Sequence, residues 1–172
     1  MNVSKVMISK EEIELKVKEI ASKIEKDYEG QELFVIGVLK GACVFVSDLI
    51  REINLPVTLD FMAVSSYGMS TESSGIVRII KDLDMDITGM NVLIVEDIID
   101  TGLTLNYLRE YLAARHVKSL KICTLLDKPQ RRKCDVLADY VGFSIEDKFI
   151  VGYGMDCKEQ YRNLPYIAAV ED

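Results

Sequence analysis

The segment 92–104 reads VLIVEDIIDTGLT, and it restricts the possible folds more than any other part of the chain. Its first four residues are aliphatic, which is typical of a strand covered on both faces, because neither face then takes a polar side chain at low cost. Glu96 and Asp97 follow directly, and a polar turn at 100–104 leads into a helical pattern. The segment therefore predicts a buried strand, a turn rich in polar side chains, and a helix.

This turn has the composition of an anion-binding loop. It contains a glycine and two threonines, so that backbone N–H groups and hydroxyls can reach a phosphate while the helix N-terminus adds positive potential. The neighbouring carboxylates would repel a second phosphate unless a cation or sugar hydroxyls were their partners. A molecule with a phosphate, a ribose diol and a bound metal would satisfy every group. The alternative is an ordinary strand–turn–helix in which Asp100 caps the helix.

Strands and helices alternate through most of the chain. Periodicity predicts helices at 10–26, 42–53 and 103–114 and strands at 33–39, 57–64, 76–80, 91–95, 119–126, 136–141 and 166–170. This order predicts one α/β domain over residues 1–172, with a mainly parallel twisted sheet flanked by helices on both faces. Ligands of such sheets bind beyond the carboxyl ends of the strands. Because Lys40, Glu96 and Lys128 each follow a predicted strand, we expect them to converge on one rim.

Two other segments and the overall charge restrict the function further. Residues 65–75 are rich in Ser, Thr and Gly, which predicts a mobile loop, and the basic run 131–133 is interpreted as a solvated turn. The net charge of −7 argues against nucleic-acid partners, which require a basic face. No CxxC pair, secretion signal or apolar run of roughly 18 residues occurs. We therefore expect a reduced, cytoplasmic protein without a membrane partner.

The chain resembles a known family over most of its length, from about residue 33 to the C-terminus. The 92–104 segment resembles the phosphoribosyl pyrophosphate (PRPP) motif of type I phosphoribosyltransferases. Lys128, Phe149, Asp156 and Arg162 are typical of the branch that acts on 6-oxopurines, the hypoxanthine-guanine phosphoribosyltransferases. The resemblance implies their fold, with a small hood and a mobile lid loop. The matching stretches are VLKGA at 38–42, SSYG at 65–68, LLDKP at 125–129, DKFIVGYGMD at 147–156 and EQYRNLPYI at 159–167.

The resemblance also implies a reaction. Enzymes of this branch use Mg²⁺ and transfer a 5-phosphoribosyl group from PRPP to N9 of hypoxanthine or guanine, giving IMP or GMP and pyrophosphate, which is purine salvage. Relatives form dimers and tetramers, so we expect a homo-oligomer. Two alternatives stay open at this point. One is a regulatory protein that keeps the fold and binds nucleotide, and the other is an enzyme that prefers xanthine.

The resemblance assigns roles to the residues around the turn. Asp100 would be the catalytic base near N7 of the purine. Glu96 and Asp97 would contact the ribose hydroxyls directly or through Mg²⁺, although strand alternation predicts that only one of them faces the sugar. The 5′-phosphate would be held by the residues that follow, Leu103 contributing only its N–H: Thr101, Gly102, Leu103 and Thr104.

The purine would lie beside a separate group of residues. Lys128 would donate a hydrogen bond to O6, which selects an oxo group over an amino group. Phe149 would stack on the ring. Backbone carbonyls near Ile150 and Asp156 would accept the 2-amino group of guanine, and Asp156 would also bind a second Mg²⁺.

Pyrophosphate and the lid complete the expected site. Lys40 and Gly41 resemble the pyrophosphate loop of the family, in which a peptide bond can be cis. The planar fork of Arg162 suits pyrophosphate oxygens. Ser66 and Tyr67 would belong to the lid that closes over the reaction centre.

Overall fold

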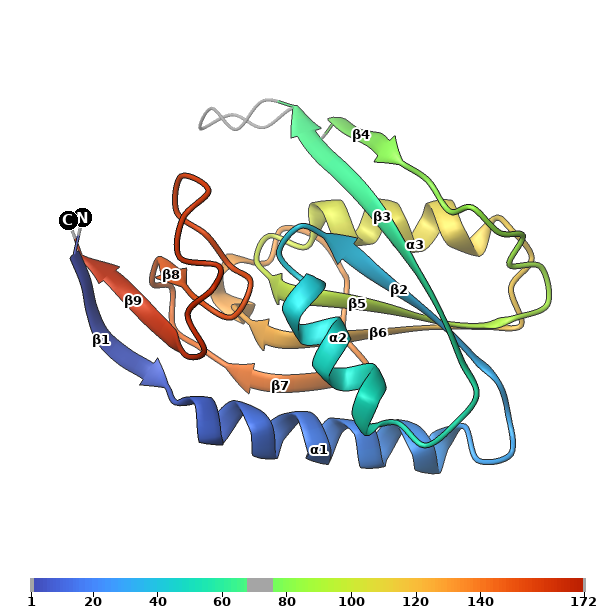
Figure 1. Ribbon diagram of the computed structural model, residues 1–172. Helices are drawn as coiled ribbons and strands as arrows, with labels where there is room; N and C mark the ends of the chain where they lie inside the picture. Colours follow the sequence, from blue (N-terminus) through green and yellow to red (C-terminus); the bar gives the residue numbers. More distant parts are fainter. Residues whose placement is uncertain (1, 68–75, 172) are drawn as a thin grey trace.

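The computed structural model describes residues 2–67 and 76–171, and its centre is a six-stranded sheet (Figure 1). The strand order is β4-β3-β2-β5-β6-β7, and every neighbouring pair is parallel except β3 and β4. The prediction of a mainly parallel sheet is therefore confirmed. Its strands are β2 (Leu33–Leu39), β3 (Val57–Tyr67), β4 (Ile76–Lys81), β5 (Asn91–Ile99), β6 (Ser119–Asp127) and β7 (Tyr140–Ser144).

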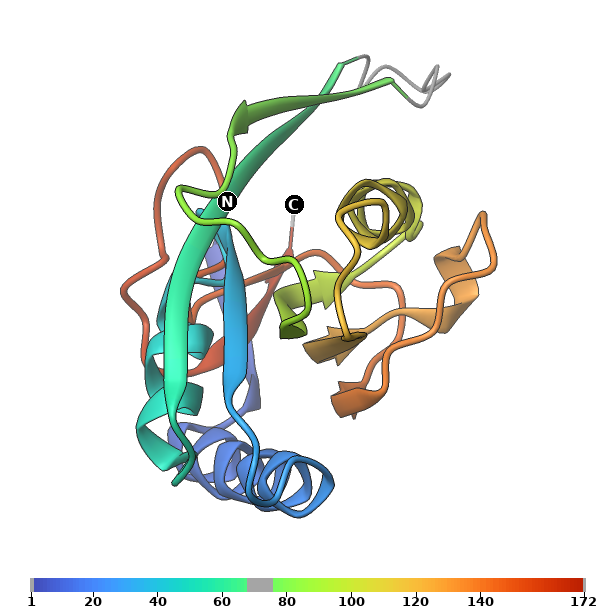
Figure 2. The same cartoon turned by 90° about the vertical axis from the view of Figure 1, so that its right-hand side faces the viewer.

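Helices cover both faces of this sheet, as predicted. The pair α1 (Lys10–Asp27) and α2 (Cys43–Glu52) lies on one face, and α3 (Leu103–Ala113) lies on the other (Figure 2). Reciprocal hydrogen bonds fix the start of α1: the Glu12 N–H donates to the Ser9 hydroxyl at 3.1 Å, and the Ser9 N–H donates to the Glu12 carboxylate at 2.7 Å.

The central strands explain the unbroken apolar runs of the sequence. On β2 and β5, Val35 and Val95 pack in the core shared with α1 and α2, whereas Ile36 and Ile94 pack in the core shared with α3. All four side chains are fully buried. Both faces of these strands therefore exclude water, and a polar residue is tolerated only where the strand leaves the core, at its carboxyl end.

A second, smaller sheet stands beyond that end. Its strands are β1 (Asn2–Ile8), β9 (Ile167–Glu171) and β8 (Ile150–Val151), paired antiparallel in the order β1-β9-β8. Figure 1 shows this sheet and the segment 152–166 beyond the arrowheads of β5 and β6, with the chain ends side by side. It corresponds to the small hood that the family resemblance implies.

The structure corrects several predicted boundaries. Residues 65–67 belong to β3 and pair with β4, so they are not part of a loop, while the rest of the expected lid, 68–75, lies outside the described residues. Ser66 and Tyr67 end β3, and their side chains also lie outside the described part. The strand predicted at 136–141 is wrong, because β7 begins only at Tyr140. Val136 is apolar for another reason, since it is buried in the core beside α3.

Candidate active site

The carboxyl end of β5 and the start of α3 enclose a cavity of about 270 Å³. Gly102 is the N-cap residue of α3 and makes no side-chain capping bond. The alternative in which Asp100 caps the helix is therefore wrong. Every residue predicted to hold the sugar phosphate lines this cavity except Leu103; the lining residues are Val38, Leu39, Gly41, Glu96, Asp97, Ile98, Ile99, Asp100, Thr101, Gly102, Thr104 and Leu105.

The shape of the turn depends on Gly102. Its φ of +82° lies in the left-handed region that favours glycine. A Cβ at this position would also come within 2.5 Å of Val136 Cγ1. The Leu103 N–H donates to the Thr101 hydroxyl over a long 3.4 Å, and this weak contact leaves the amide close to the cavity rim. Gly102 is therefore required by packing under the turn as well as by its backbone conformation.

Glu96 and Asp97 both line the cavity, although strand alternation alone would point their side chains to opposite faces. Their carboxyl groups share a hydrogen bond. Burial raises the pKa of Glu96 well above its ordinary value, and the charge of Asp97 raises it further. Burial also raises the pKa of Asp97. Two adjacent buried carboxyl groups are stabilised in their charged form only by a nearby positive charge or hydrogen-bond donor. A cation or a sugar hydroxyl would supply it.

The 40–41 loop is pressed against Asp97. A Cβ on Gly41 would lie 1.9 Å from the Asp97 Oδ2 atom, and a Cβ on Gly154 would lie 2.3 Å from the Gly41 carbonyl oxygen. Glycine is thus required where three segments converge. The loop contains a cis peptide bond, and it joins Leu39 to Lys40.

Lys40 and Arg162, both predicted to bind pyrophosphate, meet at one acidic side chain. Glu159 Oε2 lies 2.7 Å from Lys40 Nζ, and its Oε1 lies 3.3 Å from Arg162 Nη2. Arg162 also pairs with Asp156 at 3.1 Å. This arrangement places close together the two cations that we predicted to bind pyrophosphate. Glu159 was missed, because nothing in its spacing relates it to Lys40.

A second cavity of about 210 Å³ adjoins the first and contains the residues predicted to bind a purine. Lys128 is only 6 % exposed, and its ammonium donates to the Lys148 carbonyl at 2.6 Å. Phe149 is 57 % exposed, so it is not a core residue and its ring is free to stack on a ligand. The lining residues are Asp97, Ile98, Asp100, Lys128, Phe149, Ile150, Met155 and Asp156.

Comparison with known proteins identifies the family of this chain. Residues 7–158 match the family described as the phosphoribosyl transferase domain. The chain belongs to the phosphoribosyltransferase family. It is 55 % identical over 170 residues to the hypoxanthine-guanine phosphoribosyltransferase of Bacillus subtilis (strain 168), covering 99 % of this chain and 94 % of that protein.

Solved structures agree with this assignment. A hypoxanthine-guanine phosphoribosyltransferase of Bacillus anthracis, with a HEPES molecule in its active site, has a TM-score of 0.96 and 56 % identity over 99 % of this chain and 100 % of that chain. A hypoxanthine phosphoribosyltransferase of Staphylococcus aureus has a TM-score of 0.95 and 50 % identity over 98 % of this chain and 92 % of that one.

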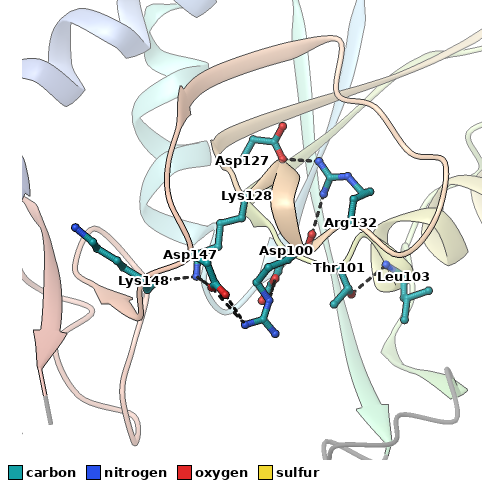
Figure 3. Close-up of polar contacts among 9 residues, drawn as sticks. Asp100, Thr101, Leu103, Asp127, Lys128, Arg132, Asp147 and Lys148 are labelled. Carbon is teal, nitrogen blue, oxygen red and sulfur yellow. Dashed lines mark hydrogen bonds and ion pairs between the residues drawn. The ribbon is translucent and has the colours of Figure 1, made fainter.

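The basic run 131–133 of this phosphoribosyltransferase is partly solvated, as predicted, because Arg131 and Lys133 are exposed. Its residues also contact the 100–104 turn, which we did not predict. Arg132 donates to the Asp100 carbonyl at 2.9 Å and also pairs with Asp127 (Figure 3). Arg131 Nε lies 2.7 Å from Asp100 Oδ1. The Lys133 N–H donates to the Thr101 carbonyl at 2.9 Å. The run therefore braces the phosphoribosyltransferase turn, a role that sequence patterning does not reveal because Asp100 lies 32 residues before Arg132.

The residues of this phosphoribosyltransferase fit a divalent cation only in part. Within 2–67 and 76–171, no three His, Cys, Asp or Glu side chains form a metal cluster. The buried pair Glu96 and Asp97 nevertheless offers hard oxygen ligands, and burial raises the pKa of both carboxyl groups. Mg²⁺ commonly takes one or two carboxylates and completes its shell with water and substrate phosphates, so the pair fits that ion. In the described chain, no helix combines the length and apolarity of a membrane span.

Proposed function

We propose that this phosphoribosyltransferase acts in purine salvage, transferring a 5-phosphoribosyl group from PRPP to N9 of hypoxanthine or guanine and releasing pyrophosphate with IMP or GMP. One observation carries the proposal: Asp97 and Asp100 line both the cavity at the 100–104 turn and the cavity that contains Lys128 and Phe149. A sugar phosphate in the first cavity and a purine in the second would meet at that shared wall, where the new bond must form.

The sugar-phosphate end would be held by backbone and hydroxyl groups. The Leu103 N–H and the hydroxyls of Thr101 and Thr104 would donate to the 5′-phosphate, and the N-terminus of α3 would favour its charge. Glu96 and Asp97 would accept from the ribose hydroxyls. These contacts would fix the anomeric carbon in line with the purine, which lowers the entropic part of the barrier.

The pyrophosphate end would be held by charge. Lys40 and Arg162 would pair with the leaving group, and the Gly41 backbone would approach it closely because it has no side chain. Glu96 and Asp97 would hold one Mg²⁺ and Asp156 a second, and these ions would supply the positive charge that pyrophosphate and the buried acids both need. The positive charge that grows at the anomeric carbon as pyrophosphate departs would face the acidic wall.

The purine end would be selected by hydrogen bonding. Phe149 would stack on the ring, and carbonyls near Ile150 and Asp156 would accept from a 2-amino group. Lys128, a donor with no acceptor capacity, would pair with O6 and would reject the 6-amino group of adenine. Asp100 would take the proton from the N7 side as the bond to N9 forms.

Steady-state kinetics with PRPP and Mg²⁺ test this function. Hypoxanthine and guanine are expected to be converted, with adenine at least about a hundredfold poorer, since a site built to pair an oxo group leaves buried groups unpaired with an amino group. Xanthine is the informative alternative substrate, because it replaces the 2-amino group with an acceptor. A protein that binds PRPP but converts none of these bases would contradict the proposal and favour a regulatory role.

Three further properties belong to the same proposal. Residues 1–172 form one domain, which the family match over 7–158 supports. The protein works in the cytoplasm, supported by free cysteines at 43, 123 and 134. It forms a homodimer or homotetramer, supported by exposed apolar side chains such as Leu15 and Ile80. Light scattering on the purified chain tests the last property, and a monomer at micromolar concentration would contradict it.

A further inference from the structure

The 131–133 run contains one side chain whose position is not explained by bracing the turn. Arg132 and Lys133 contact only main-chain oxygens of the turn, at Asp100 and Thr101. Arg131 instead reaches the Asp100 carboxylate itself, with 2.7 Å between Nε and Oδ1. Oδ1 is buried and accepts no hydrogen bond from the described residues, so the contact acts through charge and proximity.

The same guanidinium faces a second carboxylate. Arg131 Nη1 lies 3.3 Å and 3.4 Å from the two oxygens of Asp147. Asp147 Oδ1 in turn lies 3.6 Å from Lys128 Nζ. Charges therefore alternate along a chain from Asp100 to Lys128, and Figure 3 shows Asp100, Asp147 and Lys128 close together. Arg131 and Asp147 are its two middle members.

The two ends of this chain are the groups that the proposed function places on one edge of the purine. In a 6-oxopurine, N7 and O6 are neighbours on the same edge of the ring. Asp100 is assigned to the first atom and Lys128 to the second. Their separation must match that of N7 and O6 for both to act on one bound purine, and flexible side chains achieve this only when something holds them.

We propose that Arg131 is a positioning residue that, through Asp147, sets the Asp100 carboxylate and the Lys128 ammonium at the spacing of N7 and O6 of a 6-oxopurine. The inference rests on the proposed function. Arg131 touches no atom of the purine. It acts on the purine half of the reaction alone, because none of its contacts reaches the groups assigned to the 5′-phosphate or to pyrophosphate.

The test compares kcat and KM among variants of the full chain. Arg131→Gln is expected to lower kcat about fivefold and to raise the KM for hypoxanthine about threefold, effects of the size expected for the loss of a partly exposed ion pair. The KM for PRPP is expected to stay within about twofold of the parent. Arg131→Lys keeps the charge and is expected to restore kcat to within about twofold of the parent. Lys133→Gln is the matched control: it removes the same charge from the same run and leaves its main-chain contact intact.

A double-mutant cycle separates this role from a structural one. Asp147→Asn breaks the chain between Arg131 and Lys128, so it is expected to raise the KM for hypoxanthine and to add no more than about twofold when combined with Arg131→Gln. Additive effects, a parallel loss of PRPP affinity, or an Arg131→Gln variant that matches Lys133→Gln would overturn the inference. A parent enzyme without activity on any 6-oxopurine would overturn the proposed function and the inference with it, whereas an active parent and an indifferent Arg131 would overturn the inference alone.

Discussion

The two walls of the site are built by different physical means. The turn at 100–104 comes from one stretch of sequence, and it offers amides and hydroxyls fixed by a left-handed glycine and by packing on Val136. A second group of side chains, which we call the opposite wall, consists of Lys40, Asp156, Glu159 and Arg162. Paired charges hold these side chains in place, and of the four only Asp156 lines one of the two cavities. A backbone wall is rigid before a ligand arrives. In a wall of ion pairs, the cations must give up contacts with their own carboxylates before they can pair with an anionic ligand.

The difference predicts that changes in the turn cost more than changes in the opposite wall. Asp100→Asn is the strongest case, because loss of a general base typically costs 10²–10⁴-fold. We expect kcat to fall by at least about a hundredfold, while the dissociation constant for PRPP changes by less than about threefold. Rapid-quench turnover and equilibrium binding measure the two quantities. Unchanged turnover would mean that Asp100 is not the catalytic base.

Gly102→Ala tests the rigidity of the turn. The alanine must adopt a φ of +82° and place its Cβ 2.5 Å from Val136, so we expect a loss of about 2–4 kcal/mol of unfolding free energy, the sum of strain and overpacking. Gly89→Ala is the matched control, with a φ of +72° and nothing within 4 Å of the new Cβ. Denaturant unfolding of both variants gives the comparison. Equal losses would mean that Val136 does not press on the turn.

Glu96→Gln tests the cost of the buried acid pair. Burial raises the Glu96 pKa in the folded protein, so the parent is relatively most stable below the unfolded pKa near 4.5 and loses stability as pH rises through the raised value. The glutamine variant lacks this loss. We expect its advantage in unfolding free energy to be small near pH 4.5 and to grow with pH to the order of 1 kcal/mol or more, since one pKa unit corresponds to about 1.4 kcal/mol.

Melting curves recorded from pH 4.5 to 8.5 without Mg²⁺ measure this advantage. Glu29→Gln changes an exposed carboxyl and serves as the control with a flat profile. A Glu96→Gln profile as flat as the control would show that burial of Glu96 carries no cost. Added Mg²⁺ should raise the melting temperature of the parent more than that of the variant, because the pair offers the ion two carboxylates only in the parent.

Sequence alone predicted the residues of the backbone wall but not the side chains that brace it. Residues 92–104 are contiguous in the sequence. The apolar run predicts a buried strand, and the polar turn with its glycine predicts an anion-binding loop. The basic run under the turn was predicted only as a solvated turn. Its contacts with Asp100 and Asp127 were missed, because periodicity carries no information about such pairing. Val136 was read as strand for a related reason: its burial follows from covering Gly102.

The opposite wall depends on charge pairs that no local pattern encodes. Lys40 and Arg162 were predicted to bind pyrophosphate from the family resemblance, whereas Glu159 between them was not predicted at all. Its importance follows from two distances, 2.7 Å and 3.3 Å, to those cations. Lys40 lowers the pKa of Glu159 most, and Arg162 lowers it further. This carboxylate therefore stays charged at neutral pH and competes with any anion for both cations.

Removing that competitor should therefore improve binding. Glu159→Gln is expected to tighten pyrophosphate binding by up to about fivefold, because exposed ion pairs contribute at most about 1 kcal/mol, and the gain should shrink at high salt. Glu19→Gln is the matched control, since Glu19 also joins two lysines, Lys16 and Lys23, on the exposed face of α1. Calorimetric titration with pyrophosphate measures both variants. Weaker binding by Glu159→Gln would mean that the carboxylate holds the cations in place for the ligand, and the wall would then be preorganised like the turn that faces it.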